Sequence, residues 1–211
     1  MDMHISSKDY ERARFDYNQN WELRNKILYD LCQRHPRHQD FQTINAKLWL
    51  IGRTYATGIE RMIPSKGDQG SSLMQLSVHI YKNRNKLDSI LNRLSSIKEP
   101  LNPKKLKIIV NEHGRFSRLL GKILRKNRSA RSFASKYLHF HCRAVPLYDS
   151  FANEKLRKLS RWDDRWEIFE MPELADEEYF YFVMRFWHLY QQFRKIKKSV
   201  TVRHVDCFLL W

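Results

Sequence analysis

Asp149 is the residue whose position suggests chemistry most directly. It lies in the short turn VPLYDS (145–150), directly before Ser150 at the expected start of a helix. A carboxylate presented there in a basic segment can hold or activate water, or stabilise a developing positive charge. The other role for an acid at this position is to cap the helix by accepting backbone N–H groups. The sequence leaves both roles open.

The surroundings of Asp149 are strongly basic. Residues 101–150 hold twelve Lys and Arg against two acids, which is +10 of the formal net charge of +16. A helix expected over about 103–126 is apolar on one face and cationic on the other. The cationic stripe consists of Lys104, Lys107, Arg115, Arg118, Lys122 and Arg125. Ordinary solvated faces mix charges, whereas Glu112 is the only acid between 104 and 148, so we expect the stripe to contact nucleic-acid phosphates.

Residues 128–158 resemble the catalytic segment of the helix-hairpin-helix DNA glycosylases. In a common version of that family's motif a lysine precedes the catalytic aspartate by eighteen residues. Here Arg131 stands eighteen residues before Asp149, and VPLYDS resembles the family's apolar-Val-Asp-Thr/Ser turn. The resemblance implies an all-α fold and duplex DNA as the partner. It also implies hydrolysis of the N-glycosidic bond of a modified or mispaired base, with Asp149 as the catalytic carboxylate.

Two departures from the family pattern change what the resemblance implies. The hairpin glycines are absent from residues 125–129, where Asn127 is the candidate for a left-handed conformation, and Arg128 and Arg131 are expected to bind phosphate instead. Arginine at position 131 cannot form a Schiff base, so the resemblance implies a monofunctional glycosylase that leaves an intact abasic site. Lys136, about one and a half turns further along, is a candidate nucleophile only if the helix is placed differently. Its ordinary role is that of a solvated helix residue.

A glycosylase also needs a pocket for the extruded base, in which aromatic rings stack on the base and polar groups read it. The expected lining residues are Trp49, Arg53, Tyr55, Glu60 and His139. The alternative is an intrahelical Arg53–Glu60 ion pair with the two aromatic side chains in the core. We expect no cofactor and no metal site, because the cysteines are scattered and the HxH pair at 139 and 141 points in directions about 200° apart on a helix.

The elements that must position these residues are all expected to be helical. Six glycines and six prolines are few for 211 residues, and apolar residues recur at helical spacing rather than alternating. Residues 1–17 are expected to form a polar arm, and residues 18–211 a single all-α domain that resembles the glycosylase fold, with residues 104–160 as its nucleic-acid-binding and catalytic segment. The expected helices cover about 18–34, 40–62, 71–97, 103–126, 132–141, 150–160, 176–198 and the last ten residues.

Composition excludes several classes of protein. Aromatic residues make up 13% of the chain, which argues against disorder, and three distant cysteines do not form a disulfide framework. No signal peptide and no apolar run long enough for a membrane span is present in the sequence, so we expect a cytoplasmic protein without a membrane partner. Duplex DNA is the expected partner, and RNA stays open. A non-enzymatic nucleic-acid-binding module and a partner-binding protein that uses the aromatic 176–198 helix are the alternatives, and the oligomeric state is open.

Overall fold

The computed structural model describes residues 5–64, 70–159 and 168–210, and the regular elements in these ranges are helical, with no strand among them. The expected all-α fold class is confirmed. The elements are α1 (Ser7–Asp16), the π-helical turn η1 (Tyr17–Trp21), α2 (Glu22–Arg34), α3 (Phe41–Thr54), the 3-10 turn η2 (Ile59–Met62), α4 (Ser72–Lys82), α5 (Arg84–Leu94), α6 (Pro103–Gly121), α7 (Arg131–His141), α8 (Ser150–Leu159), α9 (Glu177–Ile196) and α10 (Val202–Leu209).

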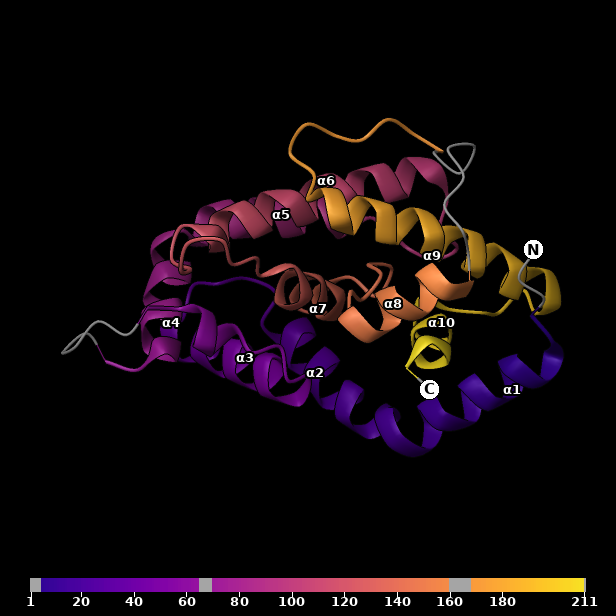
Figure 1. The fold of residues 1–211 in the computed structure, drawn as a ribbon. Helices are drawn as coiled ribbons and strands as arrows, with labels where there is room; N and C mark the ends of the chain where they lie inside the picture. The colour runs from indigo at the N-terminus through magenta and orange to yellow at the C-terminus, as the bar shows by residue number, and fades with distance from the viewer. Residues whose placement is uncertain (1–4, 65–69, 160–167, 211) are drawn as a thin grey trace.

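Helix α7 runs through the middle of the fold. Figure 1 shows α5, α6 and α9 along one side of it and α2 and α3 along the other, with α8 and α10 beside one another near its far end. Helix α7 packs directly on α2, α3 and α6, and every residue from Phe133 to Phe140 is buried. A polar side chain on α7 therefore enters the interior whichever way it points. None of the described helices is both long enough and apolar enough to cross a membrane.

The helix starts follow the capping signals in the sequence. The Asp40 side chain accepts the Thr43 N–H at 2.7 Å, and Ser71 accepts that of Met74. Asn102 caps α6, with Pro103 at the first helical position, where its missing N–H is not needed. Each of these side chains satisfies a backbone donor that the first turn of a helix leaves unpaired.

The N-terminal segment differs from the expected polar arm. Residues 7–16 form α1, whose start is fixed by a capping box between Ser6 and Asp9. Tyr10 and Ala13 are buried, and α1 packs along α10. Helical spacing of these two apolar residues provides the buried face that the polar composition of the segment concealed.

Three helices end earlier than their apolar periodicity predicted. Helix α3 stops at Thr54 rather than Met62, because Ala56 and Gly58 adopt positive φ angles of 46° and 66°. The helix expected over 71–97 divides at Asn83, whose side-chain amide donates to the carbonyl of His79. Helix α6 ends at Gly121 rather than near 126. Local polar and left-handed residues therefore interrupted patterns whose apolar periodicity continues past them.

Candidate active site

Lys136 is buried inside the fold rather than solvated. Its side chain is 4% exposed, and its ammonium group donates to three oxygens. Nζ lies 2.7 Å from Ser132 Oγ, 3.0 Å from the carbonyl of Tyr148 and 3.0 Å from Asp149 Oδ2. A buried ammonium group is tolerated only when its donors are paired, and here all three are. The expectation of an ordinary solvated lysine is therefore wrong.

Asp149 performs two tasks at once. Its side chain is 25% exposed, so it is the member of the pair that solvent can reach. Oδ2 faces Lys136, while Oδ1 accepts the backbone N–H of Phe151 at 3.0 Å at the start of α8. Asp149 therefore caps α8 and also lies beside a cation, so its capping role leaves the second carboxylate oxygen available for the chemical role that the sequence left open.

The turn that carries Asp149 is held rigidly from both sides. The Tyr148 N–H donates to Ser135 Oγ of α7 at 2.9 Å, and the Tyr148 hydroxyl donates to Glu178 Oε1 of α9 at 2.5 Å. The side-chain amide of Asn153 donates to the same carboxylate oxygen at 3.1 Å. These bonds fix the backbone at 148 and therefore the direction in which the Asp149 side chain leaves the chain.

Arg131 belongs to this framework and does not extend the free cationic surface. Its guanidinium pairs with Asp176 through Nε and with Glu178 Oε2 through Nη1 at 2.6 Å. Burial is the largest single influence and raises the pKa of Asp176, but the hydrogen bonds from Arg131 and the Tyr179 N–H, together with the charge of Arg131, lower this pKa overall. Two carboxylates already balance the charge of Arg131, so it has a structural role here rather than the phosphate-binding role expected from the sequence.

Aromatic and charged residues from η1, from the end of α3 and from α10 gather on another side of Lys136. The Tyr55 ring centre lies 5.9 Å from Lys136 Nζ, and Trp21 stacks on Tyr55 at 5.5 Å. The buried guanidinium of Arg203 lies between 5.7 and 5.9 Å from the rings of Tyr17, Trp21 and Tyr55. These distances are those of cation–π contacts, which strengthen away from water.

Arg203 and Asp206 form a buried ion pair that sequence reasoning missed. Both lie on α10, three residues apart, and both are at most 6% exposed at the side chain. Burial raises the pKa of Asp206, while the charges of Arg203 and Lys136 oppose that rise. The signal was present in the last ten residues, where two opposite charges three apart interrupt a helix that is otherwise mostly apolar.

His139 supports the site from within the core and does not line a pocket. It is completely buried, its Nδ1 lies 2.8 Å from the carbonyl of Val145, and its Nε2 lies 2.5 Å from the Tyr29 hydroxyl. Burial lowers the pKa of His139 well below its ordinary value, so the ring is neutral. Nδ1 then donates to Val145 and Nε2 accepts from Tyr29. The expectation that His139 contacts an extruded base is wrong, because no part of it is accessible.

The remaining base-pocket residues do not form one site. Arg53 and Glu60 make a two-pronged ion pair, with Nε–Oε1 at 2.7 Å and Nη2–Oε2 at 3.0 Å, and both line a separate cavity of about 330 Å³ beside Ala56. Trp49 is 47% exposed on α3. Of the five expected residues, only Tyr55 contacts Lys136.

Two arginines of the cationic stripe already bind other groups of the protein. Arg115 lies 3.6 Å from the buried carboxylate of Glu112, and Arg118 donates to the carbonyl of Glu173 at 2.9 Å. The other members of the stripe, together with Arg128, are exposed: Lys104, Lys107, Lys122 and Arg125. Asn127 has a φ angle of 62°, so it adopts the left-handed conformation expected in place of a hairpin glycine.

The described residues contain no cluster of three or more His, Cys, Asp or Glu side chains able to hold a metal ion. His139 contacts Tyr29 and Val145, whereas the ring of His141 packs at a tilt against those of Tyr137 and His38.

Comparison with known proteins gives one match. No curated protein matches the chain, and no solved structure does. A family model described as HI_0787_N, N-terminal domain, matches residues 6–145, a stretch that includes Lys136 and ends four residues before Asp149. Since this match covers more than half of the sequence, the chain belongs to the HI_0787_N family.

Proposed function

We propose that the protein binds duplex DNA and cleaves the N-glycosidic bond of a modified or mispaired base, with Asp149 as the catalytic carboxylate. The observation that carries the proposal is the 3.0 Å contact between Asp149 Oδ2 and the buried ammonium of Lys136. This contact holds the Asp149 carboxylate at a partly exposed position beside a buried cation. A carboxylate placed there can stabilise the oxocarbenium-like sugar that forms as the base departs.

The route of attack follows from which member of the pair a substrate can reach. Asp149 is partly exposed, and Lys136 lies behind it with every donor occupied. Water therefore attacks the sugar while Asp149 stabilises the positive charge, and Lys136 holds Asp149 in place. The product of this route is an intact abasic site.

The same short distance favours a second route. Asp149 takes a proton from Lys136, and the free amine attacks C1′ as the bond from C1′ to the base breaks. The departing base is protonated by solvent. The Lys136 nitrogen then loses a second proton to solvent, the C1′–O4′ bond breaks as O4′ is protonated, and the nitrogen lone pair forms the C=N bond of a covalent imine between Lys136 and C1′. Borohydride converts such an imine to a stable cross-link, so the two routes give different products.

DNA binding is supported by the charge distribution. The formal net charge of +16 raises the local concentration of a polyanion, and the exposed cations of α6 and of the following turn are free to contact phosphates. The alternative function, a non-enzymatic DNA- or RNA-binding module, is favoured by the bond from the Phe151 N–H to Asp149 Oδ1, because that bond is a capping interaction.

Base release from duplexes that each contain one modified or mispaired base tests the proposal. Asp149→Asn is expected to lower the release rate by about 100-fold or more, since it removes the charge but retains the shape. Glu154→Gln is the matched control, because Glu154 is an exposed acid on α8, the helix that Asp149 caps, and it pairs with Lys158 at the surface. Strand breaks that appear only after alkali indicate attack by water, and a borohydride cross-link that Lys136→Gln removes indicates attack by lysine. No base release from any duplex, or equal release by Asp149→Asn, would leave the binding module as the function.

A further inference from the structure

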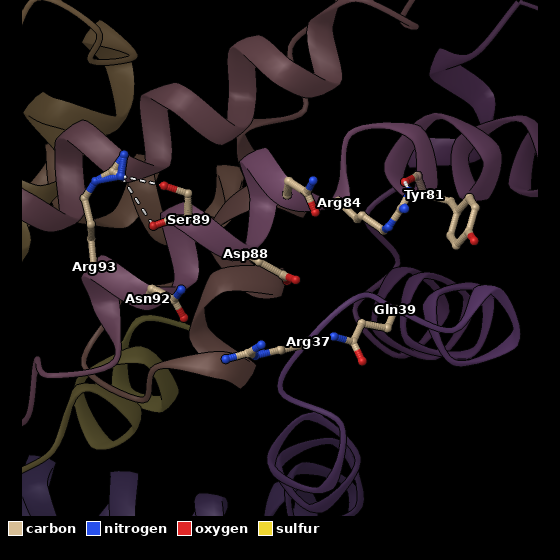
Figure 2. Close-up of a pocket in the computed structure, with 9 residues that line it drawn as sticks. Arg37, Gln39, Tyr81, Arg84, Asp88, Ser89, Asn92 and Arg93 are labelled. Atoms are coloured by element: carbon tan, nitrogen blue, oxygen red, sulfur yellow. Dashed lines mark hydrogen bonds between the residues drawn. The ribbon is translucent and has the colours of Figure 1, made fainter.

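A second cavity lies on a different side of α7 from Asp149. It has a volume of about 760 Å³ and opens between the loop after α2 and helix α5 (Figure 2). Its buried floor is connected to α7 through Tyr137, the neighbour of Lys136 in the sequence. Successive helix residues point about 100° apart, so Tyr137 and Lys136 leave α7 in different directions. No residue of the pair described above lines this cavity.

Three arginines line the cavity, and two of them are held in position. The Arg84 guanidinium lies 4.6 Å from the centre of the Tyr81 ring, and its Nη1 donates to the Tyr81 carbonyl. Arg93 Nη1 donates to Ser89 Oγ at 2.9 Å, and its Nε lies 3.4 Å from the buried carboxylate of Glu112. Arg37 makes no hydrogen bond or ion pair with any described residue, so its five donors are available. In Figure 2, Arg37 and Arg84 come from two different segments, and the Arg84 guanidinium is turned toward Tyr81.

The one acid in the lining, Asp88, is held by a buried chain of hydrogen bonds. Asp88 Oδ1 accepts from His38 Nδ1 at 2.6 Å, and His38 Nε2 accepts from the Tyr137 hydroxyl at 2.6 Å. Burial and the charge of Lys47 lower the pKa of His38 to about 4, despite the opposing carboxylate. The ring is therefore neutral at pH 7. Asp88 Oδ2 also accepts the backbone N–H of His38 at 3.4 Å, and the Asp88 side chain is 19% exposed, so its oxygens can accept further hydrogen bonds from the cavity.

The lining thus combines three positive charges with one fixed hydrogen-bond acceptor. Gln39, Asn85 and Asn92 add amide groups that both donate and accept. Planar guanidinium groups match the oxygen geometry of phosphate, and Asp88 would repel a second anionic group but accept hydrogen bonds from hydroxyls. The volume falls within the range of about 300–1,000 Å³ that small-molecule sites occupy.

We propose that this cavity binds a phosphorylated small molecule of about the size of a nucleoside monophosphate. The arginines bind the phosphate, and Asp88 accepts hydrogen bonds from the sugar hydroxyls. The proposal does not depend on the glycosylase function, because none of the residues that line the cavity takes part in the reaction proposed for Asp149.

Calorimetric titration of the full-length protein at low salt tests the proposal, with adenosine 5′-monophosphate, ribose 5-phosphate and inorganic phosphate as probes. The nucleotide is expected to bind at least about ten times more tightly than inorganic phosphate, because the sugar adds hydrogen bonds to Asp88. Arg37→Ala is expected to weaken nucleotide binding by about tenfold or more, since hydrogen bonds to charged groups are the strong ones. Arg37 has no described partner, so this variant removes no contact that supports the fold. Lys26→Ala removes an exposed charge from α2, outside the cavity, and is expected to bind like the wild type.

Three results would overturn the proposal. The first is the absence of saturable binding of the nucleotide and the sugar phosphate. The second is equal affinity for the nucleotide and inorganic phosphate, which would reduce the cavity to an unspecific anion site. The third is equal weakening by Arg37→Ala and Lys26→Ala, which would place binding in the overall positive field of the protein rather than in the cavity.

Discussion

Replacing Gly114 with alanine is expected to destabilise the protein strongly. Gly114 lies in the buried part of α6, directly against the backbone of residues 174 and 175. A Cβ atom at this position would lie 1.9 Å from the carbonyl oxygen of Leu174, 2.7 Å from its carbonyl carbon and 2.8 Å from the Cα atom of Ala175. All three contacts are with backbone, so no side chain can rotate away to relieve them.

The size of the effect follows from the overlap. Non-bonded heavy atoms pack at about 3.5–4.0 Å, so α6 and the segment at 174 must separate by more than an ångström. Overpacking in a well-packed core costs about 1–3 kcal/mol and sometimes more. We expect about 3 kcal/mol or more here. For a chain of this length that corresponds to a fall in Tm of roughly 6–12 °C. Separation also endangers the bond from Arg118 to the Glu173 carbonyl.

Gly121 provides the matched control, because it lies on the same helix and a Cβ there meets nothing within 4 Å. Alanine is favoured over glycine in a helix by up to about 1 kcal/mol, so Gly121→Ala is expected to be neutral or slightly stabilising. Urea unfolding followed by circular dichroism measures both free energies of unfolding. A Gly114→Ala variant within about 0.5 kcal/mol of the wild type would refute the close approach of α6 to Leu174.

The remaining predictions concern acid stability and binding. Burial is the main cause that lowers the pKa of His38 and of His113 to about 4. Between pH 6.5 and 4 the unfolded chain therefore binds protons that the native protein does not. We expect the free energy of unfolding to fall as the pH falls through this window. Each histidine contributes up to about 3 kcal/mol to this loss of stability. Burial raises the pKa of Glu99 to about 7, so Glu99 binds a proton more readily in the native protein and opposes part of the loss. Unfolding free energies that stay constant from pH 7 to 4.5 would contradict the buried neutral histidines. The double variant Lys107→Gln, Lys122→Gln is expected to weaken duplex binding and to reduce the slope of log affinity against log salt by up to about 2. An unchanged slope in a folded variant would show that α6 does not contact the duplex.

Much of the secondary structure was determined by local sequence, since caps and periodicity act over a few residues. Asp40, Ser71 and Pro103 begin their helices as predicted, because each satisfies or avoids backbone donors within its own first turn. The starts of the helices that carry Lys136 and Asp149 were predicted to within one residue. Where prediction of helix length was wrong, as at Asn83, a single residue outweighed the apolar pattern around it.

The sequence also indicated that Asp149 occupies a special position, but not what lies beside it. Lys136 is thirteen residues away, and its burial depends on α7 being covered from several sides at once. A helical pattern reports which side faces the core only when another side faces water. In α7 nearly every side is covered, so the pattern could not distinguish a buried lysine from a solvated one.

Only the tertiary structure decided which charges are free. Arg131 is paired with acids 45 and 47 residues away, and Arg203 approaches aromatic rings from the opposite end of the chain. A count of charges along one helix cannot include partners supplied by another helix, because those contacts depend on how the helices pack. The net charge of +16 and its concentration before residue 150 belong to the sequence. Which of those cations a ligand can reach was set by the packing of α6, α7, α9 and α10, where burial makes an unpaired charge costly and draws opposite charges together.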